Sequence, residues 1–426
     1  MKISRRGFVK GAGVAAAGGL IGAPFVALGA TRKVVVVGGG SGGATVAKYL
    51  RMTDPTIEVT LIEADKHYYT CYMSNEVLSG DRTIDTIRFD YDGLIHYGVN
   101  LVHDRVTAID ADARSVTTAD GRHFAYERCV VAPGIDFQWE EIEGYDARVA
   151  ENIPHAWRAG AQTLTLRKQL EEMADGGTLV IAPPPNPYRC PTGPYERASL
   201  IADYLKRQKA KSKIIILDAK PGFARQGLFT QAWKALYGYR GDDALIEWRP
   251  DSAVVKLDAG SRTVTTGLGD TVKADVLNII PPQKAGAIAH QAGLADDSGW
   301  CPVDLRTFES TLRPAIHVIG DAAITDAMPK TGFAANSEAK ACAAAVAALL
   351  DGRMPAAPSY LNASYSIVGP DWGFSSTAVY KLSDKGNRIE TVSGGQTPTD
   401  ATAEMRKREV AYAHDWFANI TRDIFM

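Results

Sequence analysis

Glycines at dinucleotide-binding spacing stand near the start of the chain. Residues 34–43 read Val-Val-Val-Val-Gly-Gly-Gly-Ser-Gly-Gly, and Gly38, Gly40 and Gly43 occupy the glycine positions of the G-x-G-x-x-G pattern. The valines predict a buried parallel strand, and the small residues after the turn predict a helix whose N-terminal amides can hold a pyrophosphate. We therefore expect these glycines, together with Ser41 in the same turn, to bind a dinucleotide.

An acidic residue and a cysteine follow at informative distances. The apolar run 57–62 predicts a second strand, and Glu63 follows it directly. Glu63 lies ~20 residues after the glycine pattern, the spacing expected of a carboxylate that accepts ribose hydroxyls. Cys71 lies in the run 68–72, Tyr-Tyr-Thr-Cys-Tyr, and a cysteine among aromatic residues after the adenosine half suggests a flavin tethered by a thioether. The alternative interpretation of Cys71 is a plain buried cysteine.

Two later segments have the pattern expected of a flavin site. Residues 128–134 predict a strand that runs into a small-residue turn, and residues 313–322 predict a strand that ends in Gly-Asp, whose aspartate can bind a ribityl hydroxyl. The alanine-rich helix expected up to Leu350 has a positive N-terminus that can stabilise negative charge on a reduced isoalloxazine. The further cofactor candidates in these segments are Ala132, Gly134, Gly320, Asp321 and Gly332.

The part between these segments predicts a second Rossmann-like domain. Residues 176–182 are its expected first strand, and residues 213–218 are a later one. A nicotinamide-binding protein would place another glycine fingerprint after the first strand, but residues 183–191 are rich in proline, which has no amide proton and a fixed φ. We therefore expect no phosphate cradle here and no NAD(P)H as electron donor.

Two residues after this proline-rich stretch have side chains suited to redox and proton chemistry. The thiol of Cys190 can attack or carry sulfur, and Glu196, at the start of the next expected helix, can accept a proton. The alternatives are a buried structural thiol at Cys190 and a Glu196 carboxylate that complements the helix dipole. The histidines show no paired spacing on a helix, so we expect no metal site.

The N-terminus predicts export. Residues 4–10 contain a twin-arginine pattern, and residues 11–30 are small, apolar and uncharged, which is typical of a signal for prefolded proteins. A transmembrane anchor is the less favoured interpretation, because alanine and glycine are only mildly hydrophobic. The formal net charge of −2 gives no indication of a nucleic-acid partner. We expect a periplasmic protein that is exported through the twin-arginine pathway.

Several segments together resemble the flavoprotein subunit of flavocytochrome c sulfide dehydrogenase, a relative of the sulfide:quinone oxidoreductases. The resemblance implies FAD joined through its 8α-methyl group to Cys71, and oxidation of hydrogen sulfide to sulfur or polysulfide. It also implies a heterodimer with a subunit that carries haem c, since no Cys-x-x-Cys-His haem attachment signal is present. The segments that carry the resemblance are residues 4–10, 68–72, 188–197, 299–304 and 358–362.

The chain departs from this family at one position. Its relatives pair the residue corresponding to Cys190 with a second cysteine in a segment that matches residues 361–366, and this chain has Ser364 there. The usual redox disulfide therefore cannot form. Cys342 is the least improbable substitute, because its helix begins near the expected flavin. We favour instead a single-thiol route in which Cys190 collects sulfur as a persulfide.

The expected fold is α/β, with two Rossmann-like domains of the disulfide-reductase-like flavoprotein type and a C-terminal interface domain. Two alternative functions remain: a membrane-associated sulfide:quinone-type enzyme, and a flavin electron-transfer or assembly subunit without sulfide turnover. The charged run 406–409 argues against stable membrane insertion. The expected parts are a signal peptide at 1–30, an FAD-binding domain at 31–150 and 275–355, a second Rossmann-like domain at 151–274 and the interface domain at 356–426.

Overall fold

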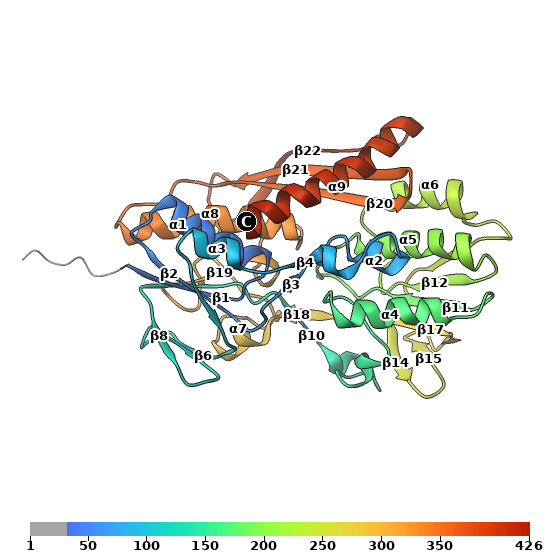
Figure 1. Ribbon diagram of the computed structural model, residues 1–426, viewed down its shortest axis with the longest axis horizontal. Coiled ribbons are helices and arrows are strands. Elements are labelled where there is room, and N and C mark those ends of the chain that lie inside the picture. Colours follow the sequence, from blue (N-terminus) through green and yellow to red (C-terminus); the bar gives the residue numbers. More distant parts are fainter. Residues whose placement is uncertain (1–31) are drawn as a thin grey trace, which may run out of the picture. The chain divides into compact units, whose positions relative to one another are not determined.

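The computed structural model describes residues 32–426, and the predicted signal peptide at 1–30 lies outside the described residues. A five-stranded parallel sheet in the order β19-β9-β1-β2-β5 organises the part that the sequence predicts to bind FAD (Figure 1). The valines of β1 are buried at the centre of this sheet, as their continuous apolar run predicts. The strands are β1 (Lys33–Val37), β2 (Glu58–Glu63), β5 (Asn100–His103), β9 (Arg128–Val131) and β19 (Ile316–Val318).

A second parallel sheet has four strands in the order β13-β12-β11-β17. These strands are β11 (Thr178–Ala182), β12 (Lys213–Leu217), β13 (Ile246–Arg249) and β17 (Val276–Ile279). Two parallel sheets of this kind confirm the α/β fold class. The expected boundary after residue 274 is wrong, because β17 pairs along its whole length with β11 and buries its side chains in the second sheet.

Each parallel sheet is interrupted along the chain by an antiparallel meander. One follows β5 and the other follows β13. The meanders are β6 (Val106–Asp110), β7 (Ser115–Thr118) and β8 (His123–Ala125), and β14 (Val254–Asp258), β15 (Thr263–Thr266) and β16 (Thr271–Lys273). Two short antiparallel pairs complete the first part: β3 (Tyr68–Tyr69) with β4 (Arg88–Phe89), and β10 (Ile135–Phe137) with β18 (Gln283–Ala285).

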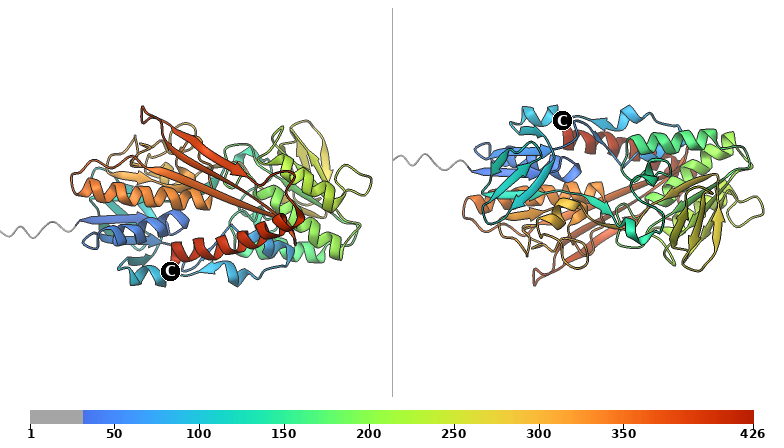
Figure 2. Two further views of the ribbon diagram at one scale, coloured as in Figure 1. Left: turned by 90° about the horizontal axis from the view of Figure 1, so that it is seen from above. Right: turned by 90° about the horizontal axis from the view of Figure 1, so that it is seen from below.

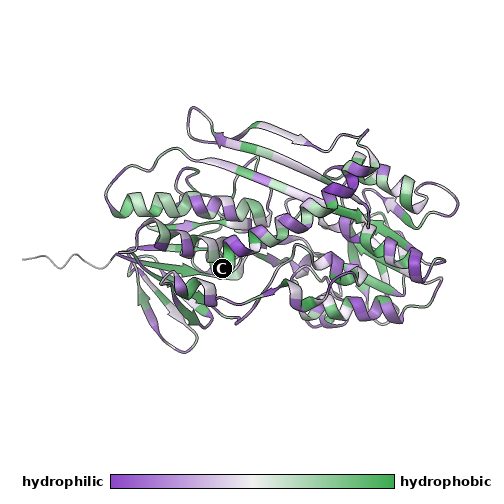
Figure 3. Ribbon diagram, turned by 45° about the horizontal axis from the view of Figure 1, so that its top comes forward, coloured by the Kyte–Doolittle hydropathy of each residue, from purple (hydrophilic) through white to green (hydrophobic). Residues whose placement is uncertain are grey.

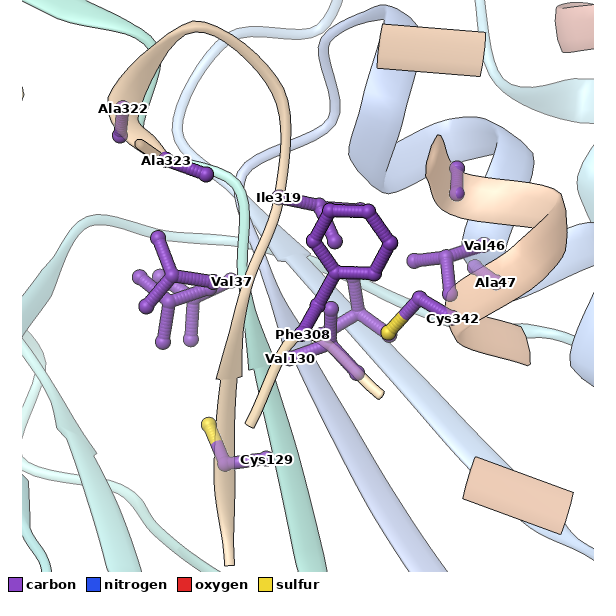
Figure 4. Packing of buried hydrophobic residues seen from close by; sticks show 14 of the residues in the cluster. Val37, Val46, Ala47, Cys129, Val130, Phe308, Ile319, Ala322, Ala323 and Cys342 are labelled. Atoms are coloured by element: carbon purple, nitrogen blue, oxygen red, sulfur yellow. The ribbon is translucent and has the colours of Figure 1, made fainter. Parts of the chain in front are cut away.

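Helices α1 (Ser41–Thr53) and α8 (Gly332–Leu350) pack against each other beside the first sheet. Figure 4 shows Val46 of α1 and Cys342 of α8 in this core, near Val130 of β9 and Phe308. Small side chains on both helices let their backbones approach closely. The other helices of the two parallel-sheet units are α2 (Ser74–Ser79), α3 (Asp92–His96), α4 (Ala161–Glu172), α5 (Gly193–Gln208), α6 (Gln226–Tyr237) and α7 (Ala287–Gln291).

Among residues 32–426, α8 is the one helix whose length and composition would suffice to cross a membrane. Most of it is coloured as apolar in Figure 3. Its apolar residues pack mainly against α1 and strand β20 (Ser359–Gly369), in the hydrophobic core. Core packing accounts for the apolar character of α8.

The C-terminal segment forms an antiparallel sheet in the order β20-β21-β22 and a long final helix (Figure 2). Its further elements are β21 (Trp372–Leu382), β22 (Ile389–Gln396) and α9 (Ala403–Phe425). Near one end of α9, Arg406 Nη2 donates to Gln231 Oε1 of α6 at 3.0 Å. Near the other end, Lys48 Nζ of α1 donates to the carbonyl oxygen of Asp423 at 2.9 Å. The helix therefore contacts both parallel-sheet units.

Candidate functional site

A cavity of about 560 Å³ opens at the carboxyl ends of β1, β2, β9 and β19. Ligands in open α/β sheets bind at this edge. The structure brings together here all of the predicted cofactor residues except Gly43, although they come from distant parts of the chain. The predicted cofactor residues that line the cavity are Gly38, Gly40, Ser41, Glu63, Cys71, Ala132, Gly134, Gly320, Asp321 and Gly332.

The first and third glycines of the pattern each allow a close backbone approach. Gly38 has φ +93°, and a Cβ there would lie 2.5 Å from the carbonyl oxygen of Ala132. A Cβ on Gly43 would lie 1.7 Å from the carbonyl oxygen of Gly38. Gly43 therefore does not line the cavity but shapes it, because its missing side chain lets α1 start directly against the turn.

Glu63 stabilises the same turn. Its Oε2 accepts the backbone N–H of Gly39 at 2.6 Å, and its Oε1 accepts the backbone N–H of Asp65 at 2.9 Å. A carboxylate has about four acceptor positions, so both oxygens keep capacity for the ribose hydroxyls that the sequence predicts.

Asp321 presents an unused acceptor at the cavity. Its Oδ1 is buried and has no hydrogen-bond partner among the described residues, and its burial raises the pKa of the carboxyl group. Lys330 Nζ donates to the carbonyl oxygens of Asp321 and Ala323 at 2.7 and 2.9 Å and so holds this turn. A buried acceptor on a cavity wall needs a donor such as a ribityl hydroxyl. This orphaned oxygen and the glycine cradle fit FAD.

A smaller cavity of about 190 Å³ adjoins the first one. Cys71, Arg189 and Gly332 line both cavities, so the two meet at these residues. Cys190 and Glu196, the predicted catalytic pair, both line the smaller cavity. The thiol and carboxylate proposed for sulfur chemistry therefore open toward the place where the predicted flavin tether lies.

Cys190 has an unusual backbone conformation in this wall. Its φ is +60°, a left-handed value that is costly for a residue with a side chain, and its N–H donates to the carbonyl oxygen of Lys330 at 2.8 Å. Burial raises the pKa of the Cys190 thiol and the ionised Glu196 carboxylate raises it further, whereas the charge of Arg189 lowers it. The thiol needs a proton acceptor before it can react as a thiolate.

Glu196 has the position and proton affinity for this role. Burial raises its pKa to about 7, while two hydrogen bonds oppose the shift. The backbone N–H of Ile367 donates to Oε1 at 2.9 Å, and Asn75 Nδ2 donates to Oε2 at 2.8 Å. A carboxyl group that is half ionised near neutral pH can both accept and release a proton.

A buried network that sequence reasoning missed orients Asn75. Arg197 Nε donates to Asn75 Oδ1 at 3.1 Å, and Arg197 Nη1 donates to Asn278 Oδ1 at 2.8 Å. With its oxygen engaged, the Asn75 amide must present its nitrogen to Glu196. In the sequence, only the position of Arg197 directly after Glu196 could have indicated this network, because no motif marks Asn75 or Asn278.

The remaining cysteines are separated from this site. Cys129, Cys301 and Cys342 are fully buried and line neither cavity, and Figure 4 shows Cys129 and Cys342 in the hydrophobic core. Ser364 does line the smaller cavity together with Cys190, and it accepts a hydrogen bond of 3.1 Å from Asn362 Nδ2. The serine thus lies in the wall of the same cavity as Cys190, at the position where the family resemblance predicts a second cysteine.

The proline-rich loop after β11 is held by its own contacts. Lys220 Nζ donates to the carbonyl oxygen of Pro184 at 2.8 Å and pairs with Asp218 at 2.7 Å, and the Tyr188 hydroxyl donates to the carbonyl oxygen of Pro191 at 2.8 Å. Carbonyl groups that are bonded to a buried ammonium group differ from an amide nest that binds phosphate. Among residues 32–426, no cluster of metal-ligating side chains is placed to hold an ion.

Three family models match the chain. They are "Sulfide dehydrogenase [flavocytochrome c] flavoprotein chain, central" over residues 163–281, "Flavocytochrome c sulphide dehydrogenase, flavin-binding" over 356–425 and "Pyridine nucleotide-disulphide oxidoreductase" over 32–181. The fold and the site thus define a flavoprotein with the pyridine nucleotide-disulfide oxidoreductase fold.

Sequence matches to individual proteins identify the family within this class. The flavoprotein chain of sulfide dehydrogenase [flavocytochrome c] from Chlorobaculum thiosulfatiphilum is 60% identical over 47 residues, 98% of that sequence and 11% of this chain. The chain belongs to this family, a sulfide-oxidising type of flavin oxidoreductase related to the sulfide:quinone oxidoreductases. The mitochondrial sulfide:quinone oxidoreductase of Mus musculus is 23% identical over 68% of this chain, and the match spans only 65% of the mouse protein.

Solved structures confirm the fold. The sulfide:quinone oxidoreductase from Aquifex aeolicus superposes with a TM-score of 0.70 at 20% identity, over 92% of both chains. A covalent putidaredoxin reductase–putidaredoxin complex matches with a TM-score of 0.65 at 18% identity, over 93% of this chain and 99% of the other. At these identities both likenesses concern the fold alone.

Proposed function

We propose that this chain is the FAD subunit of a periplasmic sulfide dehydrogenase, which oxidises hydrogen sulfide to sulfur or polysulfide and passes the electrons to a cytochrome c subunit. The observation that carries the proposal is the shared wall of the two cavities. Cys190 and Glu196 line the smaller cavity, and Cys71 lines both that cavity and the one that fits FAD.

FAD would be held by the glycine turn, Glu63 and Asp321, and a thioether from Cys71 would tether it at the 8α position. When bound, FAD supplies a two-electron acceptor that can pass electrons on singly. Cys71 lies in the wall between the two cavities, where a tether would hold the flavin next to the cavity of Cys190. A covalent link also prevents cofactor loss outside the cytoplasm.

The chain's own residues would handle the sulfur and the proton. Hydrosulfide and the Cys190 thiol would form a persulfide. One S–S bond would form, the S–H bond of Cys190 would break, and bound FAD would supply the acceptor for the two electrons. Glu196 accepts the released proton, because its pKa of about 7 allows the ionised form at neutral pH. This route needs no second thiol, which is consistent with Ser364 in the cavity wall.

Ser364 is also the observation that favours a second candidate, a flavin electron-transfer or assembly subunit that has no sulfide turnover. Steady-state reduction by sulfide separates the candidates. It is measured with cytochrome c and with a quinone as acceptor, on the purified protein with and without its haem subunit. Reduction that depends on the haem subunit supports the proposal. Reduction of a quinone without that subunit indicates the sulfide:quinone type, and no turnover with either acceptor indicates the electron-transfer subunit.

A further inference from the structure

Arg189 carries a buried donor that no described residue uses. Its Nε has no hydrogen-bond partner, and neither has the indole Nε1 of Trp157. The rest of Arg189 is held in place: its backbone N–H donates to Gln283 Oε1 at 2.9 Å, and Nη2 donates to the carbonyl oxygen of Trp157. Arg189 and Trp157, which are hydrogen-bonded to each other, thus each carry one N–H group without a partner.

The two residues that carry these donors lie at or beside the junction of the two cavities. Arg189 lines both cavities, and Trp157 and Cys190 line the smaller one. The carboxylate nearest to the guanidinium is Asp321, whose Oδ2 lies 3.9 Å from Nη1, too far for a hydrogen bond. Arg189 is therefore a buried positive charge with spare hydrogen-bonding capacity beside the Cys190 thiol.

We propose that Arg189 and Trp157 form an anion subsite that binds the substrate as hydrosulfide beside Cys190, an inference that rests on the proposed function. A buried anion is costly unless a charged partner and hydrogen bonds compensate for its lost hydration. A guanidinium group remains charged at every working pH and donates through fixed N–H groups. The subsite thus supplies both requirements for a small sulfur anion.

The charge balance with Glu196 is consistent with this subsite. Hydrosulfide enters as an anion and takes Arg189 as its counter-ion, so the Glu196 carboxylate remains free. Glu196 can then accept the one proton that leaves the Cys190 thiol when the persulfide forms.

Thiocyanate, a small sulfur anion, tests the subsite without turnover. Its binding to the flavin-loaded protein is measured by isothermal titration calorimetry. Arg189→Gln should weaken binding about ten- to hundredfold, the usual range for a hydrogen bond to a charged group, and Trp157→Phe should weaken it about three- to tenfold. Arg225→Gln is the matched control, because Arg225 lines the same cavity but is exposed and donates to Gln396 Oε1 at 2.8 Å.

Equal thiocyanate affinity in Arg189→Gln and the wild type would overturn the proposal, as would an equal loss in Arg225→Gln. If Arg189→Gln does not fold, Arg189→Lys and Trp157→Phe decide the question, and two unchanged affinities overturn it. Anaerobic sulfide titrations provide a separate readout: the sulfide concentration for half-maximal flavin reduction should rise in Arg189→Gln. Wild-type protein that binds thiocyanate but is not reduced by sulfide would contradict the proposed function and leave the anion subsite standing.

Discussion

The backbone N–H of Ile367 donates a hydrogen bond of 2.9 Å to Oε1 of Glu196, and this bond joins β20 to the first turn of α5. The predicted proton acceptor is thus positioned by the C-terminal sheet as well as by its own helix. A backbone donor cannot rotate away, so Glu196 keeps one oxygen fixed while its ionisation changes.

Replacement of Glu196 by Gln should lower the rate of sulfide-dependent flavin reduction by about 10²- to 10⁴-fold, the usual contribution of a general base. In the wild type the rate should rise as the pH increases through about 7, because only the ionised carboxylate accepts a proton. Anaerobic stopped-flow measurements over this range check both effects. The ionisation of sulfide itself affects both proteins equally, so an identical rise in Glu196→Gln would contradict the assignment.

FAD should remain with the chain after acid precipitation, since Cys71 lies in the wall of the cavity that fits FAD. Cys71→Ser should release the flavin on denaturation, because a hydroxyl group is a far weaker nucleophile than a thiolate. Intact mass spectrometry of the denatured proteins measures the adduct directly. A wild-type mass without flavin would disprove the thioether, and Cys342→Ala should keep the adduct.

Cys190→Ala should abolish sulfide-dependent flavin reduction, whereas Cys342→Ala should leave it largely intact. Cys342 is fully buried in the core and lines neither cavity, so the same chemical change there leaves the site thiol in place. Single-turnover reduction by sulfide compares the two variants. Full activity in Cys190→Ala would mean that hydrosulfide attacks the flavin directly.

NADH and NADPH should neither bind tightly nor reduce the flavin. The loop after β11 is rich in proline, and Lys220 bonds to the carbonyl oxygen of Pro184, so the loop cannot provide the amide nest that a nicotinamide pyrophosphate needs. Anaerobic mixing of the flavin-loaded protein with NADH tests this. Rapid bleaching of the flavin absorbance would refute it.

Gly43→Ala should destabilise the protein by about 3 kcal/mol or more, at the upper end of overpacking costs. The new methyl group would lie 1.7 Å from the carbonyl oxygen of Gly38, so α1 would have to move away from the glycine turn. Thermal unfolding and FAD retention measure the effect. Gly395→Ala is the control, because a Cβ there meets nothing within 4 Å; a similar loss in both variants would point away from helix–strand packing.

Much of the cofactor site could be predicted from the sequence because it depends on local patterns. The valine run and the spacing of Gly38 and Gly43 predict a strand, turn and helix, and parallel strands bring their carboxyl ends to one edge, where Asp321 joins them. The prediction of the second sheet was less accurate. It placed β17 in the FAD-binding domain instead of the second domain, because the apolar residues of β17 would suit either sheet.

By itself, the sequence determined the dinucleotide-binding fold and the candidate thiol, since both depend on residue type and local spacing. The departure at Ser364 was implied by the resemblance to the family. Only the tertiary structure decided that Arg189 lies where the two cavities meet and that Asn75 and Ile367 hold Glu196. These contacts join segments far apart in the chain, and their hydrogen bonds form only after packing excludes water. No local periodicity records such a pairing, because it arises from the burial of several elements at once.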